Sequence, residues 1–305
     1  MRRWTPADLP DQSGRTALVT GANSGLGLHT SLELARSGAR VLLAVRTPAK
    51  GEQALARIRT EVPAAAVELV ALDLASLGSV QAAADDVLQR APALDLLVDN
   101  AGVMALPRRT TADGFEMQLG TNHLGHFALT GRLLPALLAA DAPRVVVVSS
   151  GAHRAGRIDF DDLMSERSYA RWGAYGQSKL ANLLFARELS RRADGTLLVA
   201  SAHPGYAATN LQTGQGSRLL EGAMAIANRA VAQSDAQGAW PSLYAATMPD
   251  VQPDDYWGPG FFELRGHPRR VDRTPAAKDD VVAHRLWQVS ETLTGVVYDA
   301  LPVRA

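Results

Sequence analysis

The sequence predicts an α/β fold in which a parallel β-sheet is covered by helices on both faces. Short apolar runs alternate with amphipathic or alanine-rich stretches through the first two thirds of the 305 residues. The runs are apolar at consecutive positions, which is typical of strands buried on both faces. Connections of helix length favour right-handed crossovers between parallel strands. We therefore predict a single domain with a doubly wound sheet of the Rossmann type.

The individual elements follow from local pattern. We predict strands where apolar, β-branched runs of strand length occur: Thr16–Val19, Arg40–Val45, Val67–Leu72, Leu94–Val98, Arg144–Ser149 and Thr196–Ser201. We predict helices in the stretches between them: Leu26–Arg36, Lys50–Thr60, Leu77–Arg90, Gly114–Ala140 and Ala174–Arg192.

No internal repeat or linker divides the chain, so we expect one domain over residues 1–305. We assign its parts in chain order: 1–14 to an N-terminal extension, 15–204 to a dinucleotide-binding and catalytic core, 205–275 to a substrate lid and variable region, and 276–305 to a C-terminal segment.

The composition is that of a soluble globular protein, with 47% hydrophobic residues and a formal net charge of zero. Zero net charge gives no electrostatic basis for binding nucleic acid or an acidic membrane surface. The chain has no cysteine, which excludes disulfides and cysteine-ligated metals. The N-terminus lacks the apolar segment of a signal peptide, and no apolar run reaches the roughly 18 residues of a membrane span. We expect a cytoplasmic protein without a membrane anchor.

The strongest catalytic candidate is Tyr-Gly-Gln-Ser-Lys at residues 175–179. Only three of the 31 basic residues are lysines, so a lysine four positions after a tyrosine is improbable by chance. On a helix the side chains of Tyr175 and Lys179 lie on one face. A nearby ammonium favours the phenolate and should lower the tyrosine pKa from about 10 toward neutrality. Taken alone, the pair is also compatible with an exposed helix face that has no catalytic role.

Residues 20–27, Thr-Gly-Ala-Asn-Ser-Gly-Leu-Gly, follow the first predicted strand and open the first predicted helix. In such a loop the glycines allow a tight turn, close approach of the backbone to a pyrophosphate, and close packing of helix on strand. The helix N-terminus offers N–H groups and a positive dipole to the phosphates. We predict a dinucleotide phosphate site formed by the loop: Gly21, Asn23, Ser24, Gly25, Leu26 and Gly27.

The end of the second strand indicates which dinucleotide binds. An acidic residue there would bind the ribose 2′-hydroxyl of NAD, whereas an arginine would accept the 2′-phosphate of NADP. The sequence has Arg46, with Lys50 four positions on and no carboxylate before Glu52. We predict NADP(H) as the preferred cofactor, bound by Arg46 with Lys50 as a helper. NAD(H) is the alternative, in which Arg46 only covers an exposed strand end.

The glycine loop and the Tyr-x-x-x-Lys pair together resemble those of the short-chain dehydrogenase/reductase family. Further motifs match the family in order and imply additional cofactor contacts: Asp73 and Leu74; Asn100, Ala101 and Gly102; and Pro204, Gly205 and Thr209. In the family the first pair contacts adenine, the triplet is the Asn-Ala-Gly motif near the adenine ribose, and the last three belong to the loop at the nicotinamide carboxamide. Ser150 precedes Tyr175 by 25 residues, roughly twice the gap of many family members, and the extra segment, residues 152–163, resembles the insertion of the retinol dehydrogenase and WW-domain oxidoreductase branch.

The resemblance implies an enzyme that interconverts a carbonyl and an alcohol, with a catalytic set of four residues: Asn122, Ser150, Tyr175 and Lys179. Ser150 would hydrogen-bond the substrate oxygen and Tyr175 would exchange the proton. Lys179 would hold the nicotinamide ribose, and Asn122 would hold a water of a proton relay. We assign the serine role to Ser150 and expect Ser149 to point into strand packing.

The substrate side is less well defined by the sequence. Apolar residues after the nicotinamide loop, including Leu211, predict a lid over a lipophilic aldehyde, ketone or alcohol. His153 and Trp172 flank the catalytic residues in sequence and are candidates for the pocket wall. His123 and His126 lie three positions apart without an evident third ligand, so we predict no metal site.

Alternative functions can be weighed on the same residues. A regulator that only senses NAD(P) would not need the complete catalytic set. A nucleotide-sugar epimerase or dehydratase is disfavoured because those relatives resemble Gly-x-x-Gly-x-x-Gly rather than this loop. The expected partner is a small-molecule substrate, and a homodimer or homotetramer could form through the long helices at 114–140 and 174–192.

Overall fold

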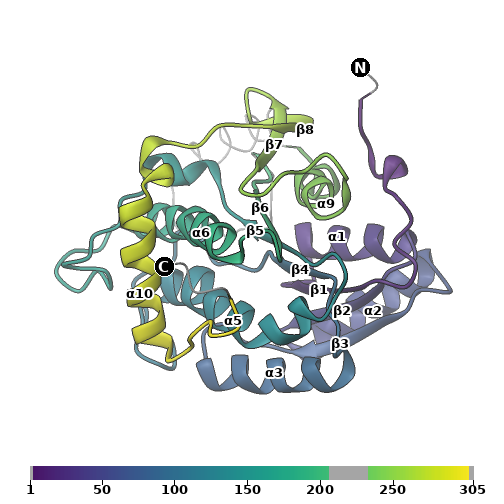
Figure 1. The fold of residues 1–305 in the computed structure, drawn as a ribbon, viewed down its shortest axis with the longest axis horizontal. Coiled ribbons are helices and arrows are strands. Elements are labelled where there is room, and N and C mark those ends of the chain that lie inside the picture. Colours follow the sequence, from purple (N-terminus) through teal and green to yellow (C-terminus); the bar gives the residue numbers. More distant parts are fainter. Residues whose placement is uncertain (1–2, 206–232, 302–305) are drawn as a thin grey trace, which may run out of the picture.

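A computed structural model describes residues 3–205 and 233–301 (Figure 1). Their named strands form one eight-stranded sheet of order β3-β2-β1-β4-β5-β6-β7-β8. The strands are β1 (Thr16–Thr20), β2 (Arg40–Val45), β3 (Val67–Ala71), β4 (Leu96–Asp99), β5 (Arg144–Val148), β6 (Leu198–Ala202), β7 (Tyr256–Phe261) and β8 (Arg265–Arg270). All neighbours pair in parallel except β7 and β8. This confirms the predicted α/β fold with a doubly wound sheet.

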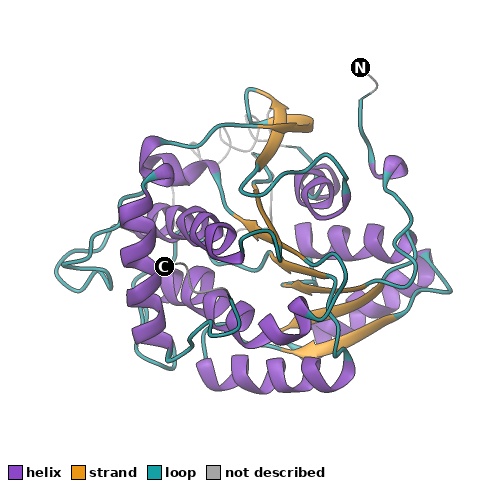
Figure 2. Cartoon of the chain, viewed as in Figure 1, coloured by secondary structure: helices purple, strands orange, loops and turns teal. Residues whose placement is uncertain are grey.

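Helices cover both faces of the sheet (Figure 2). The α-helices are α1 (Gly25–Arg36), α2 (Pro48–Glu61), α3 (Leu77–Arg90), α4 (Met117–Leu119), α5 (Gly125–Leu138), α6 (Arg171–Ala193), α8 (Asp235–Gly238), α9 (Trp240–Thr247) and α10 (Asp280–Thr294). The shorter helical turns are η1 (Pro6–Asp8), η2 (Gly120–Leu124, a π-helix), η3 (Gly151–Ala155) and η4 (Pro275–Lys278). One apolar cluster joins α1, α2 and α9 to the sheet, and another joins α3, α5 and α6 to its opposite face.

Helix α10 forms an additional layer outside α5 and α6 (Figure 1). The side chain of Asp279 caps it by accepting from the backbone N–H groups of Val281 and Val282, and the helix ends before Gly295, which has a left-handed φ of 66°. Trp287 of α10 is buried against Phe127 of α5, with ring centroids 5.1 Å apart. The long helices that the sequence suggests for oligomer contacts are therefore partly covered by the chain's own C-terminal helix. The oligomeric state stays a prediction.

Strands β7 and β8 are absent from the sequence-based assignment because they contain Pro259 and Pro268, which pair with each other. Proline lacks the N–H that a sheet interior requires and is confined to edges and irregular positions. Here β8 is the edge strand, and β6 pairs only with Tyr256 and Trp257 of β7, before the proline. The region 205–275 is expected to be a lid and variable segment. It also contributes two strands to the main sheet and the helix α9, which packs against the sheet.

The long helix predicted at Gly114–Ala140 is interrupted. It consists of α4, the π-helical turn η2 and α5, and Asn122 lies within the π turn. Wider turns of this kind are often found at functional sites. In the part of the chain that the structure describes, no helix is both long and apolar enough to span a bilayer.

Candidate active site

A cavity of about 670 Å³ opens at the carboxyl ends of the parallel strands, where the strand order reverses between β1 and β4. Ligands of open α/β sheets bind at such a switch point. Most of the predicted cofactor residues line it: Gly21, Asn23, Ser24, Gly25, Leu26, Gly27, Arg46, Asp73, Leu74, Asn100, Ala101, Gly102, Pro204 and Gly205. Ser150, Trp172, Tyr175 and Lys179 are on its walls as well.

Some predicted site residues lie elsewhere. Lys50 is exposed in the first turn of α2 and is not part of the cavity wall. His153 is expected in the pocket wall, but it is buried and does not line the cavity. The Nδ1 atom of His153 lies 2.7 Å from the carbonyl oxygen of Ser150. Thr209 and Leu211 lie outside the described residues.

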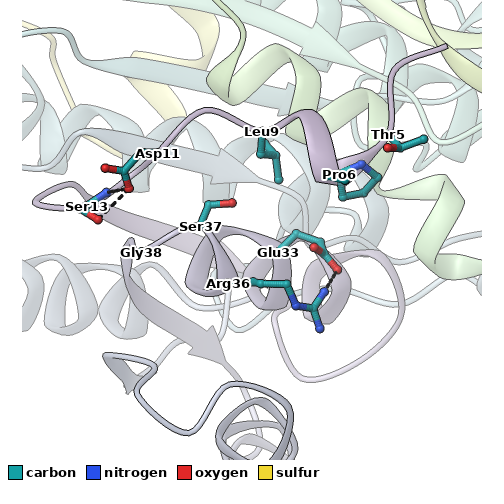
Figure 3. Close-up of a pocket in the computed structure, with 10 residues that line it drawn as sticks. Thr5, Pro6, Leu9, Asp11, Ser13, Glu33, Arg36, Ser37 and Gly38 are labelled. Carbon is teal, nitrogen blue, oxygen red and sulfur yellow. Dashed lines mark hydrogen bonds and ion pairs between the residues drawn. The ribbon is translucent and has the colours of Figure 1, made fainter. Parts of the chain in front are cut away.

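A second hollow, of about 790 Å³, lies between the N-terminal segment and the end of α1 (Figure 3). Its lining residues Ser13 and Gly38 precede β1 and β2, so it is at the amino ends of these strands. Of its three charged residues, Arg36 pairs with Glu33, and Asp11 accepts hydrogen bonds from Ser13. The hollow contains none of the predicted catalytic residues, and we therefore assign the active site to the other cavity despite its smaller volume.

The glycine loop has the geometry of a phosphate cradle. Gly21 has a left-handed φ of 66°, and a Cβ there would lie 3.0 Å from the Cα of Ala101. A Cβ on Gly27 would lie 2.4 Å from the carbonyl oxygen of Gly21. The side chain of Ser24 does not cap α1, which leaves the N-terminal turn without that competitor for an anion. The loop therefore fits the pyrophosphate of a dinucleotide, and Arg46 is exposed at the cavity wall directly after β2.

Tyr175 and Lys179 lie one turn apart on α6, with exposed fractions of 8% and 4%. Lys179 Nζ donates a hydrogen bond to the carbonyl oxygen of Val148 at 3.2 Å and lies 5.9 Å from the centroid of the Tyr175 ring. A Cβ on Gly102 would be 3.3 Å from Nζ, so the ammonium reaches the Asn-Ala-Gly turn. The pair is thus buried between α6, β5 and the cofactor side of the cavity.

Burial dominates the ionisation of this pair. It lowers the pKa of Lys179 to about 8 and raises the pKa of Tyr175 above its usual value of 10, while a hydrogen bond with Ser150 lowers the Tyr175 pKa in part. From the sequence we expect Lys179 to lower the pKa of Tyr175. The structure instead shows a raised pKa, because the buried phenolate would lose its hydration. Tyr175 is therefore protonated at neutral pH and can act as a proton donor.

The two serines after β5 have different environments. Ser149 is buried, and its hydroxyl donates to the carbonyl oxygen of Lys179 at 2.8 Å. Ser150 is half-buried at the cavity wall, where Tyr175 also lies, and its hydroxyl accepts from the N–H of Ala152 at 3.2 Å. This geometry favours Ser150 as the residue that meets a substrate oxygen.

Asn122 lies behind the cavity wall. Its Oδ1 accepts from the N–H of Val103 at 2.7 Å, and its Nδ2 donates to the Val103 carbonyl and to Ser178 Oγ, both at 2.9 Å. Both amide hydrogens are therefore used within the protein. The side chain braces the segment after Gly102 against α6, and the water that it is expected to hold stays a prediction.

Several wall residues are not among those selected from the sequence: Ala44, Leu72, Val103, Met104, Thr121, Val148, Ser149, Gly151, Ala152, His203, Asp235, Glu263 and Leu264. Asp235 begins α8, and its Oδ2 is 3.7 Å from where a Cβ of Gly25 would lie. Glu263 and Leu264 come from the turn between β7 and β8. These segments carry no motif, and only the packing of α8 and the β7–β8 hairpin brings them to the site.

A glycine cradle at the switch point, next to a buried Tyr–Lys pair and a serine, defines a nicotinamide-dependent oxidoreductase. Comparison with known proteins agrees. The sequence profile described as short chain dehydrogenase matches residues 15–219, so the chain belongs to the short-chain dehydrogenase/reductase family.

The chain is similar to human retinol dehydrogenase 14, with 42% identity over 93% of this chain and 87% of that protein. It is also similar to human retinol dehydrogenase 13, with 43% identity over 93% and 85% of the two chains. Among solved structures it resembles an uncharacterized protein from Mycobacterium paratuberculosis, with a TM-score of 0.81 and 45% identity over 99% and 100% of the chains. A short chain dehydrogenase from Shigella flexneri, complexed with NADP, has a TM-score of 0.64 and 25% identity over 82% and 97%. The predicted family and its retinol dehydrogenase branch are confirmed.

Proposed function

We propose that this oxidoreductase uses NADP(H) to interconvert a lipophilic aldehyde or ketone and the corresponding alcohol. The observation that supports the proposal is that one cavity has the glycine cradle, Arg46, Ser150, Tyr175 and Lys179 on its walls. A regulator that only senses the cofactor would not need Ser150 and Tyr175 directed to the same space.

In this proposal the bound cofactor supplies or accepts the hydride. Ser150 hydrogen-bonds the substrate oxygen and stabilises its developing negative charge. During reduction Tyr175 donates a proton to that oxygen, and during oxidation it takes the proton back. The positive charge of Lys179 stabilises the transient phenolate, and its position beside Gly102 suits contact with the nicotinamide ribose.

The cofactor preference can be tested at Arg46. We expect wild-type protein to bind NADPH more tightly than NADH in a fluorescence titration, because the guanidinium can pair with the 2′-phosphate. Arg46→Leu should weaken NADPH binding by about tenfold or more and change NADH binding little. Arg109→Leu is the matched control, since Arg109 is exposed and lies outside the cavity wall. A wild-type preference for NADH, or an equal loss for both cofactors in Arg46→Leu, would contradict the NADP(H) proposal.

The substrate class is supported by apolar residues on the cavity wall, among them Val103, Met104, Trp172 and Leu264. Relatives named retinol dehydrogenases make retinaldehyde a sensible test compound. We expect kcat/KM with NADPH to rise from glyceraldehyde through hexanal to decanal and retinaldehyde. A preference for the short polar aldehyde would contradict the lipophilic pocket, and tight NADPH binding without turnover of any carbonyl would favour the regulator.

A further inference from the structure

His126 is a buried side chain for which the proposed chemistry has no use. It lies in the first turn of α5, is 1% exposed, and bridges two segments through its ring. Its Nε2 lies 2.9 Å from Oγ1 of Thr20, the last residue of β1 before the glycine loop. Its Nδ1 lies 3.0 Å from the carbonyl oxygen of Asn122 in the π turn.

The partners of His126 define which ring nitrogen carries hydrogen. A carbonyl oxygen can only accept, so Nδ1 must be the donor to Asn122. Burial lowers the pKa of His126, the hydrogen bond to Asn122 raises it in part, and the nearby charge of Lys179 lowers it, with a net pKa of about 4, so the ring is neutral at physiological pH. In the neutral ring Nε2 is an acceptor. The Thr20 hydroxyl donates to it at 2.9 Å, and the alternative acceptor, the carbonyl oxygen of Val98, is farther away at 3.4 Å.

The hydrogen bonds continue beyond Thr20. Its Oγ1 accepts from the N–H groups of Asn100 and Ala101, each at 2.9 Å. A series of hydrogen bonds, each donating in the same direction, therefore runs from the Asn-Ala-Gly turn through Thr20 and His126 to the carbonyl oxygen of Asn122. Both ends of this chain belong to the cavity or support it, because Asn100 and Ala101 line the wall and Asn122 braces Val103.

We propose that His126 is a positioning residue, a neutral Nδ1–H imidazole that holds Asn122 in register with the cofactor loop. Through Asn122 it fixes Val103 and the wall beside Lys179. The kinetic part of this inference rests on the proposed function, whereas the part that concerns the tautomer and the hold on Asn122 does not.

A matched pair of substitutions separates the two hydrogen bonds of the ring. In His126→Asn the side-chain amide nitrogen is as many bonds from Cα as Nδ1 and can still donate to Asn122. In His126→Gln the amide reaches the place of Nε2 and keeps only the contact with Thr20. We expect kcat to fall about fivefold to tenfold in His126→Gln and to stay within about twofold of wild type in His126→Asn. The Kd for NADPH should stay within about threefold in both. Equal kcat in the two variants would overturn the positioning role.

Two measurements test the inference without turnover. In ¹⁵N spectra of the seven histidines, the signal missing from His126→Asn should show a neutral Nδ1–H ring from pH 5 to 8. The N–H of Val103 should exchange with solvent about tenfold faster in His126→Gln than in His126→Asn, because its acceptor Asn122 is no longer held. An Nε2–H ring, titration within that pH range, or equal exchange in the variants would overturn the inference. Wild-type protein without turnover would contradict the proposed function only.

Discussion

Single residues at this site have ionisation states that burial sets more strongly than neighbouring charge does. Lys179 and Tyr175 both have pKa values shifted toward their neutral forms. The position of these residues on one face of a helix could be predicted, because residue type and four-residue spacing are written in the sequence, and their catalytic role stays a prediction. Their pKa shifts could not, because burial depends on how α6 packs against β5 and the Asn-Ala-Gly turn.

Tyr175→Phe removes the proposed proton donor and keeps the ring that packs in the cavity wall. We expect kcat to fall by about 10²–10⁴-fold, the usual contribution of general acid–base catalysis. NADPH affinity in a fluorescence titration should change little, since no charge is lost. Turnover near the wild-type rate would exclude Tyr175 as the general acid.

Asp99, at the end of β4, is fully buried and accepts one hydrogen bond, from Thr130 at 3.0 Å. Burial raises its pKa to about 8, against about 3.9 for an unfolded aspartate. Between these pH values the folded protein holds one more proton than the unfolded chain, so this group makes stability fall as pH rises from about 4 to about 8.

Asp99→Asn removes that titration and keeps an acceptor for Thr130. We expect the stability of Asp99→Asn relative to wild type to increase with pH. The free energy of unfolding of the variant minus that of wild type should be larger at pH 8 than at pH 5. The difference should grow by at most about 1.4 kcal/mol per pH unit. Urea unfolding of both proteins across this range measures it. Parallel pH dependences would mean that Asp99 does not titrate in that window.

Secondary-structure elements were predictable where one pattern governs them. Leu77–Arg90 was recognisable as a helix by its apolar periodicity, and it matches α3. The π turn η2 was not, because its five residues continue the composition of the helices on either side. The four-residue helix α8 is likewise too short to produce a periodic pattern. Its importance comes from tertiary packing, which brings Asp235 to the loop that begins α1.

The contact between α8 and α1 leads to a prediction about cofactor affinity. The carboxylate of Asp235 faces Gly25, where a pyrophosphate is expected, and burial raises its pKa because ionisation is costly there. Repulsion between like charges should weaken binding, so Asp235→Asn should bind NADPH about fivefold more tightly. Wild-type affinity should also improve at lower pH, as the carboxylate gains a proton.

Asp85→Asn is the control for this substitution, because it removes the same charge from the exposed face of α3. Its NADPH titration should match wild type. Unchanged or weaker binding by Asp235→Asn would show that the carboxylate does not oppose the phosphates.

On the scale of the whole molecule, the sheet extends beyond the strands that the sequence indicates. The six predicted strands correspond to β1–β6, with ends shifted by at most two residues. The sheet then continues into β7 and β8, whose prolines and glycines conceal strands that only the tertiary context stabilises. The C-terminal part completes the core through the aromatic contacts of Trp287 and Tyr298, with ring centroids 4.5 Å apart.

The C-terminal layer should therefore contribute to global stability. Trp287 is 2% exposed and contacts Phe127, Phe185 and Tyr298. Trp287→Ala should lower the free energy of unfolding by about 3–5 kcal/mol through loss of burial and creation of a cavity. Val281→Ala on the same helix is the control, since Val281 is 79% exposed and its loss should change stability by about 0.5 kcal/mol or less. Equal urea midpoints for the two variants would show that α10 is not part of the cooperative core.

Deuterium transfer to a lipophilic aldehyde from NADPH that carries deuterium at both C4 positions of the nicotinamide tests the central claim most directly. The proposed function predicts that wild-type protein forms the alcohol with one deuterium on the former carbonyl carbon, and that Tyr175→Phe binds the labelled cofactor but forms almost none. Mass spectrometry of the product distinguishes this result from exchange with solvent. Tight cofactor binding by wild-type protein without deuterium in any alcohol product would contradict the claim.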